Sequence, residues 1–155
     1  MPSLRPHWSP DKRTVISESV STAERAAERS LNLALAAART AEDNRGENIV
    51  VLDMRAITPV FDYFVIVTGN SRRQLHAISE EIDHCLEDEL GDRRMGIEGY
   101  HESRWILLDY GNVVIHLFDS ETREYYALEQ LWSSSPQVPL PWQENRSTPT
   151  EIDGE

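Results

Sequence analysis

The stretch Trp105-Ile-Leu-Leu-Asp-Tyr-Gly-Asn-Val-Val-Ile-His-Leu-Phe118 decides the fold. Two apolar, β-rich runs flank Gly111-Asn112, and glycine at the first of two loop positions is typical of a type II′ hairpin turn. We therefore expect antiparallel strands over residues 105–110 and 113–118. With a two-residue loop, Tyr110 lies opposite Val113, and the pairing continues outward in steps of two residues.

The two faces of this predicted hairpin differ in chemistry, because side chains alternate along a strand. One face is apolar and is expected to lie in the core; it carries Ile106, Leu108, Tyr110, Val113, Ile115 and Leu117. The other face, which we call the mixed face, carries Trp105, Leu107, Asp109, Val114, His116 and Phe118. His116 is expected to accept or donate a hydrogen bond, with Asp109, diagonal to it, as the candidate partner. Trp105 is either covered by a helix or exposed as a contact anchor, since tryptophan is enriched at binding hot spots.

Two helices and two strands are predicted between Ser21 and Gly91. Ser21-Thr-Ala-Glu24 and Ser71-Arg-Arg-Gln74 are capping boxes, and each begins a helix with apolar residues at helical spacing. Between these helices, Ile49–Leu52 and Tyr63–Val67 are near-continuous apolar runs, typical of strands buried on both faces. Gly91 is expected to end the second helix.

The remaining predicted elements complete the order α-β-β-α-β-β-β-α. Residues 93–98 are expected to form a short strand. Asp119-Ser120 caps a last helix that runs to Trp132, with Tyr125, Leu128 and Leu131 facing inward. This order predicts an α/β (α+β) fold in which helices pack on the faces of a mixed β-sheet.

Both ends of the chain have compositions typical of disorder. Residues 1–20 are rich in Pro and Ser and are expected to be a disordered N-terminal arm. Residues 133–155 are Pro-rich and acidic at their end, and are expected to be a disordered tail. The domain itself is thus predicted to span residues 21–132.

Composition restricts the function classes. The 155 residues carry a formal net charge of -12, so the chain gains nothing from the counterion release that drives phosphate binding. We expect no strong direct nucleic-acid binding, whereas a basic partner protein would be attracted. Cys85 is the one cysteine, which favours a reducing compartment, and no apolar run is long enough to span a membrane. We expect a cytoplasmic protein without a membrane anchor.

The motifs that resemble catalytic sites are incomplete. Gly69-Asn-Ser71 follows a strand and opens a helix, like the phosphate-binding element of nucleotidyltransferases. Those enzymes also need paired carboxylates for magnesium, and no Asp-x-Asp occurs between residues 72 and 118. No two histidines have the i, i+4 spacing of a helical metal site, and Cys85 lies on an apolar stripe where a packed thiol is expected. We predict no catalytic, metal or cofactor residues; the alternative is a nucleotidyltransferase-like enzyme that uses Gly69 and Ser71.

Several blocks together resemble one family. The blocks are Ile49-Val-Val-Leu-Asp53, Asp62-Tyr-Phe-Val-Ile-Val-Thr-Gly-Asn-Ser71, Glu98-Gly99, Ser103-Arg-Trp-Ile-Leu-Leu-Asp-Tyr-Gly-Asn-Val-Val-Ile-His116 and Tyr126-Ala-Leu-Glu-Gln-Leu-Trp132. From about Leu31 to Trp132 the chain closely resembles the ribosomal silencing factor family, also called the Iojap family. The resemblance implies a nucleotidyltransferase-like fold that has lost its catalytic carboxylates.

The resemblance also implies a function. Members of the family bind the large ribosomal subunit at universal ribosomal protein fourteen. They thereby block association with the small subunit and repress translation when nutrients are scarce. Members also act in assembly of the large subunit in organelles, and can form homodimers.

The contact surface that the resemblance implies centres on the predicted hairpin. It comprises Trp105, Leu107, Asp109, Tyr110 and His116. Four of these five lie on the mixed face. Tyr110 falls on the core face in the expected register, so either it reaches outward at the strand end or the register differs.

Overall fold

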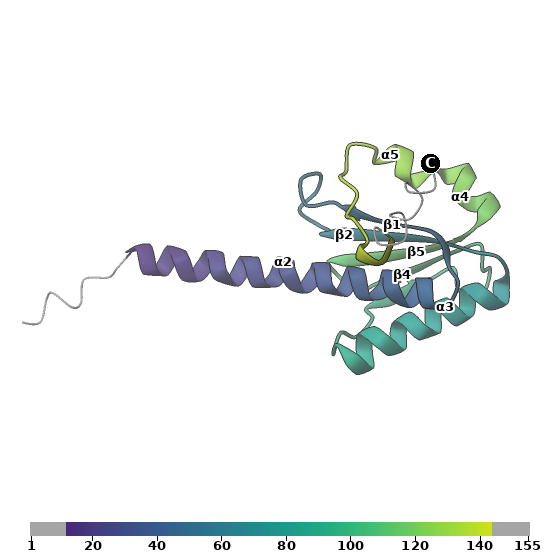
Figure 1. The fold of residues 1–155 in the computed structure, drawn as a ribbon, viewed down its shortest axis with the longest axis horizontal. Helices are drawn as coiled ribbons and strands as arrows, with labels where there is room; N and C mark the ends of the chain where they lie inside the picture. The colour runs from purple at the N-terminus through teal and green to yellow at the C-terminus, as the bar shows by residue number, and fades with distance from the viewer. Residues whose placement is uncertain (1–11, 144–155) are drawn as a thin grey trace, which may run out of the picture.

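The structure of the chain, a computed structural model, describes residues 12–143, with side chains from residue 22 onward. In this part of the chain, ten elements follow one another (Figure 1): α2 (Lys12–Asp43), β1 (Glu47–Asp53), β2 (Tyr63–Gly69), α3 (Arg72–His84), the π-helical turn η1 (Cys85–Glu89), β3 (Gly96–Glu98), β4 (Trp105–Asp109), β5 (Val113–Asp119), α4 (Ser120–Tyr126) and α5 (Leu128–Leu131). The expected order of helices and strands is confirmed, although the last helix is divided in two.

The strands form one mixed sheet in the order β1-β2-β5-β4-β3. The central strands β2 and β5 run parallel, and every other neighbouring pair is antiparallel. The predicted α/β fold with a mixed sheet is therefore confirmed. β3 is shorter than expected and pairs only through Gly96–Glu98.

Helices α2 and α3 cover the first face of the sheet (Figure 1). Four alanines of α2 have no exposed surface, so the helix backbone packs close to the strands: Ala34, Ala37, Ala38 and Ala41. From α3, Leu75, Ile78 and Ile82 fill the same core as the apolar side chains of the hairpin. This main core buries the inward-facing side chains of β4 and β5.

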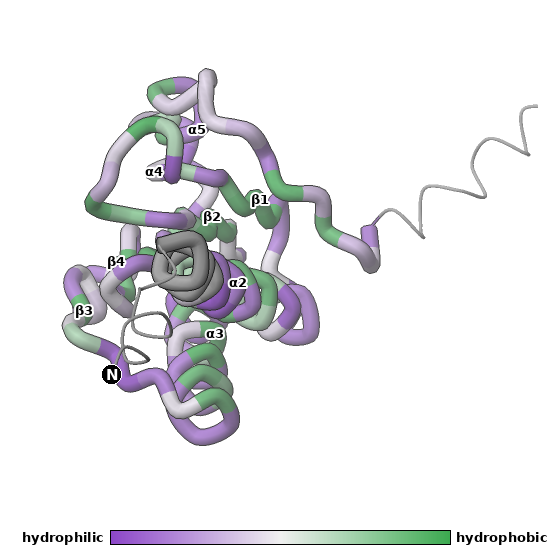
Figure 2. The backbone as a smooth tube through the Cα atoms, turned by 90° about the vertical axis from the view of Figure 1, so that its left-hand side faces the viewer, coloured by the Kyte–Doolittle hydropathy of each residue, from purple (hydrophilic) through white to green (hydrophobic). Residues whose placement is uncertain are grey.

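The second face of the sheet has a smaller core, beneath α4 and α5. Figure 2 shows the hydrophobic residues of β1 and β2 between the α2–α3 layer and the α4–α5 layer. The buried members of this smaller core are Leu52, Met54, Phe64, Ile66, Val114, Phe118 and Leu128. Trp105 and Leu107 of β4 pack against it but are only partly buried. The cover over β4 is therefore incomplete.

The predicted hairpin register is confirmed. Leu108 pairs with Ile115 and Ile106 pairs with Leu117, and the Tyr110 amide donates to the Val113 carbonyl at 3.0 Å. Gly111 has a φ of +91°, a conformation that glycine adopts without strain and that a type II′ turn requires at its first loop position.

The start of α3 also forms as the capping box predicts. The Ser71 hydroxyl accepts a hydrogen bond from the Gln74 amide at 3.1 Å. The Gln74 side chain reaches back to the amide of Asn70 instead of Ser71. Cys85, expected to be packed in the core, is only half-buried, because the helix changes to a π-helical turn at this residue.

Helix α2 begins earlier than the sequence predicts. It starts at Lys12, so it passes through the expected cap at Ser21 and through residues 12–20 of the expected disordered arm. Neither Pro nor Gly occurs between Lys12 and Gly46, and the capping-box pattern is also compatible with a helix interior. The N-terminal part of α2 extends beyond the sheet (Figure 1). The rest of the expected arm, residues 1–11, lies outside the described part of the chain.

The predicted last helix is wrong beyond its first two turns. Asp119 caps α4 as expected and accepts from the Thr122 amide at 2.7 Å, but Ala127 has a φ of +47° and separates α4 from α5. The break changes which side chains face the sheet. Leu128 is buried, whereas Tyr125 is 80% exposed and Leu131 is 68% exposed.

The predicted disordered tail is wrong for residues 133–143. The Asp53 amide donates to Pro136 O and the Val138 amide donates to Val51 O, both at 2.8 Å, so this segment covers the edge of β1. Leu140 is buried in the main core. Prolines are tolerated along a sheet edge, which is why a Pro-rich segment can pair here. Residues 144–155 of the expected tail lie outside the described residues.

Candidate functional site

The predicted contact residues of the hairpin lie on both faces of the sheet. Trp105, Leu107 and Asp109 alternate along β4 with buried residues, and all three are half-buried on the second face. His116 of β5 lies directly opposite Leu107 on that face. The structure therefore brings together four of the five predicted contact residues.

Tyr110 lies on the first face, as the register predicts. Its ring is buried in the main core, and its hydroxyl donates to Oδ1 of Asp83 on α3 at 3.0 Å. Burial, together with this hydrogen bond, raises the pKa of the Tyr110 hydroxyl well above its ordinary value. The structure does not place Tyr110 with the other four residues, and it ties the end of β4 to α3.

Trp105 is partly covered and partly open. Its ring centroid lies 4.8 Å from that of Phe118 and 4.8 Å from that of Tyr126 on α4. Its indole Nε1 donates to His116 Nδ1 at 3.1 Å. Trp105 was expected to be either covered by a helix or exposed, and it is partly both. Helix α4 packs on one side of the indole, while the remainder is accessible.

His116 is almost fully buried and serves as the acceptor for Trp105. It is 5% exposed, and its ring meets the ring of Phe64 edge-on at a centroid distance of 4.8 Å. Burial lowers the pKa of His116 to about 4, so the ring is neutral at pH 7. In the described part of the chain, its Nε2 has no hydrogen-bond partner.

The expected pairing of His116 with Asp109 is wrong. Trp105 is the other diagonal neighbour of His116, and its indole N–H takes the acceptor nitrogen. Asp109 turns toward the hairpin loop, where its Oδ1 accepts from the Gly111 amide at 2.8 Å. The carboxylate therefore stabilises the turn and retains an exposed side.

An open hollow of about 610 Å³ adjoins Trp105, and we call it the aromatic hollow. It is bounded by the rings of Trp105, Tyr125 and Tyr126 and by the charged side chains of Glu102, Arg104 and Glu121. The sequence-based reasoning missed Tyr125 and Tyr126 as surface residues, since it assumed one continuous helix. The adjacent tyrosines were the available signal, because neighbouring residues lie about 100° apart around a helix, so two large rings are seldom both directed into one core.

The Gly69–Ser71 element is already engaged within the protein. Ser71 Oγ caps α3, and the Asn70 amide donates to the Gln74 side chain. A Cβ atom on Gly69 would lie 2.6 Å from a Leu75 methyl, so this glycine serves close packing of β2 against α3. These observations assign the element a structural role.

The described residues contain no group of three or more His, Cys, Asp or Glu side chains placed to hold a metal ion. No helix among them is both long and apolar enough to cross a membrane.

The fold and the mixed face define a class: a mixed α/β protein with an incompletely covered sheet surface. The chain belongs to the ribosomal silencing factor family, because the family model described as "Ribosomal silencing factor during starvation" matches residues 27–154. The match continues past Trp132, where the resemblance was expected to end. Family membership assigns the chain a role in ribosome silencing, with the ribosome as partner.

Relatives and solved structures agree with this assignment. The chain is 45% identical over 104 residues to ribosomal silencing factor RsfS of Bacillus subtilis, covering 67% of this chain and 87% of the relative. It is also 42% identical over 74 residues to the mouse protein named "Mitochondrial assembly of ribosomal large subunit protein 1". That match covers 46% of this chain and 32% of the relative. A crystal structure from Chromobacterium violaceum is similar with a TM-score of 0.64 and 33% identity, covering 70% of this chain and 88% of that one.

Proposed function

We propose that the chain binds the large ribosomal subunit through universal ribosomal protein fourteen and thereby blocks association with the small subunit. This would repress translation under nutrient limitation. The mechanism is steric exclusion and involves no catalytic step. The names of the relatives support the two parts of the proposal, since one refers to silencing and another to the large subunit.

The observation that carries the proposal is the incomplete cover over β4. Leu107 lies half-exposed between an indole and a carboxylate, on a strand that the main core holds in place. Tryptophan is enriched among binding hot spots, so Trp105 beside the exposed part of Leu107 is the candidate anchor of this surface. Asp109 and the net charge of -12 favour a basic protein surface over RNA phosphates.

Leu107→Glu tests this proposal. Glutamate removes the apolar contact of Leu107 and carries a charge that must be desolvated at the centre of the interface. We therefore expect a loss of at least tenfold in affinity for large subunits, or about 1.4 kcal/mol. Binding is measured by co-sedimentation with purified large subunits in sucrose gradients. Subunit joining is followed in the same gradients after small subunits are added.

Leu90→Glu is the matched control. Leu90 is 40% exposed and follows η1, on the α3 side of the molecule. The variant therefore makes the same substitution away from β4, and should bind and block joining like the original chain. Equal binding by the two variants would remove the β4 surface from the proposal.

A further inference from the structure

The aromatic hollow has a continuous aromatic wall. The rings of Trp105 and Tyr126 lie 4.8 Å apart, and those of Tyr126 and Tyr125 lie 4.9 Å apart at an interplanar angle of 89°. Tyr125 is 80% exposed and Tyr126 is 49% exposed, so burial in the core does not explain why they are aromatic. The wall is continuous with β4 through Trp105.

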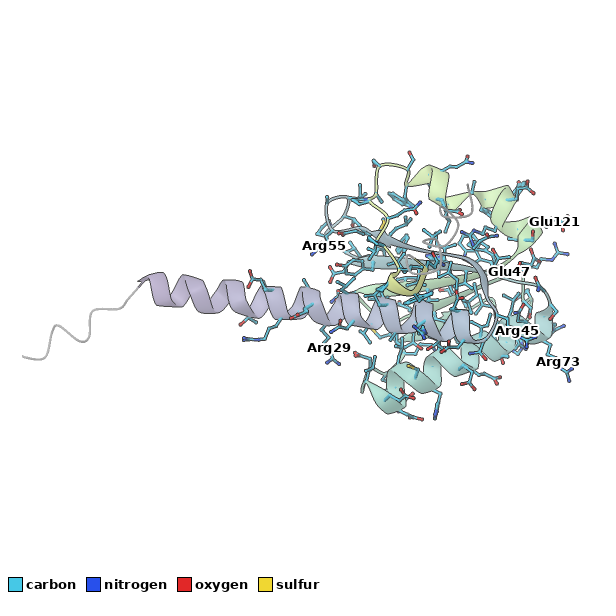
Figure 3. All side chains as sticks on the ribbon, in the orientation of Figure 1. Arg29, Arg45, Glu47, Arg55, Arg73 and Glu121 are labelled. Carbon is cyan, nitrogen blue, oxygen red and sulfur yellow. The ribbon has the colours of Figure 1, made fainter. Side chains whose placement is uncertain are left out.

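The charged side chains that line the hollow together carry a net negative charge. Glu102 and Glu121 are exposed carboxylates, and within residues 22–143 Arg104 is the one cation that lines the hollow. Among the described residues, no salt bridge joins Arg104 to either carboxylate. Glu121 lies at the N-terminal end of α4, at the periphery of the domain (Figure 3).

We propose that the aromatic hollow binds an arginine side chain of a basic partner protein. A guanidinium group stacks on aromatic faces and donates to carboxylates in its own plane, so it uses both the wall and the carboxylates. A lysine ammonium group would interact mainly with the carboxylate charges. The inference rests on the proposed function only for the identity of the partner, since the hollow itself can be tested without ribosomes.

A peptide titration of the full-length chain tests the hollow directly. The probe is acetyl-Gly-Arg-Gly-amide, and the readout is the NMR signal of the Trp105 indole N–H, assigned with Trp105→Phe. We expect a saturable shift of this signal. The peptide with citrulline, which keeps the shape but has no charge, should produce no saturable shift, and the lysine peptide should bind more weakly than the arginine peptide.

Charge variants distinguish binding of the peptide in the hollow from unspecific attraction of the peptide to an acidic protein. The double variant Glu102→Gln with Glu121→Gln should bind the arginine peptide about two- to fivefold more weakly, as expected for exposed ion pairs. Arg104→Gln should strengthen binding, because it removes a like charge. Glu124→Gln is the control, since Glu124 is exposed on α4 but does not line the hollow.

Three results would overturn the inference: no saturable shift with the arginine peptide, equal binding of the citrulline peptide, or an equal loss with Glu124→Gln. Preferential binding of adenosine monophosphate would also overturn it, because the hollow would then be a nucleotide-stacking surface. Failure of Leu107→Glu to affect large-subunit binding would instead contradict the proposed function, while the peptide results would stand on their own.

Discussion

The buried His116 fixes the orientation of the partly exposed Trp105. His116 is held among Phe64, Phe118 and the strands, and its Nδ1 accepts the indole hydrogen of Trp105. The indole therefore has a defined orientation before any partner arrives. A side chain that is ordered in advance loses less conformational entropy on binding, which favours affinity.

The buried imidazole also makes stability depend on pH. Its pKa is about 4 in the folded chain and ordinarily 6.5, so the unfolded chain takes up the proton first as the pH falls. Folding stability should therefore decrease below about pH 6.5 and continue to decrease until about pH 4. From this residue we expect a loss of about 2 kcal/mol between pH 7.5 and pH 5, measured by urea unfolding.

His116→Asn is the comparison variant for this pH dependence. Asparagine can keep an acceptor near the indole but does not titrate in this range. Its unfolding free energy should vary about 2 kcal/mol less between the two pH values than that of the original chain. Parallel pH curves for the two proteins would show that His116 is not the source.

Among the elements, the divided helix α4–α5 depends on one buried cation. Arg123 is 8% exposed; it donates to Asn48 O and Thr68 Oγ1 and forms a salt bridge of 2.7 Å with Glu129. These contacts join both short helices to β1 and β2. A helix of seven residues and one of four are too short to be stable alone, so their position comes from this contact and from Leu128.

Arg123→Ala should destabilise the fold by about 2–4 kcal/mol, because it leaves Glu129, the Asn48 carbonyl and the buried Thr68 hydroxyl without their donor. The measurement is the unfolding free energy in urea. Arg104→Ala, an exposed arginine without a salt bridge in the described structure, should change it by less than about 0.5 kcal/mol. Similar losses for both variants would mean that the Arg123 contacts do not hold the two helices.

Local patterns predicted the hairpin, the α3 cap and the order of elements along the chain, because those features depend on neighbours in sequence. The break at Ala127 and the pairing of residues 136–138 with β1 depend on distant contacts, so composition and periodicity misled there. The same holds for the site. Alternation along β4 placed Trp105, Leu107 and Asp109 on one face, and the family resemblance implied that they are contact residues. The acceptor for Trp105 and the exposure of Tyr125 required the three-dimensional arrangement.

For the whole molecule, the net negative charge determines which kinds of partner are attracted and which are repelled. A chain with a net charge of -12 is repelled by RNA phosphates and attracted to basic protein patches. On a ribosome, such a chain is directed toward sites that are made of protein. This selectivity complements the contacts of the mixed face.

The association rate with the proposed partner, isolated universal ribosomal protein fourteen, should therefore fall with salt. We expect a decrease of about tenfold or more between 50 and 500 mM potassium chloride, with a much smaller change in the dissociation rate. Stopped-flow fluorescence of the tryptophans measures both rates. An association rate that does not vary with salt would remove electrostatic steering from the mechanism.

The parallel pairing of β2 with β5 has a consequence for how the chain folds. It joins Tyr63 to Val113, residues separated by 50 positions, whereas β4 and β5 meet across a two-residue turn. Closing the long loop costs more chain entropy and is slow until the intervening segment is ordered. We expect the β4–β5 hairpin to form early, in the folding transition state, and to serve as the template on which β2 docks. The strand pair that presents the mixed face would then also be the nucleus from which the central sheet grows.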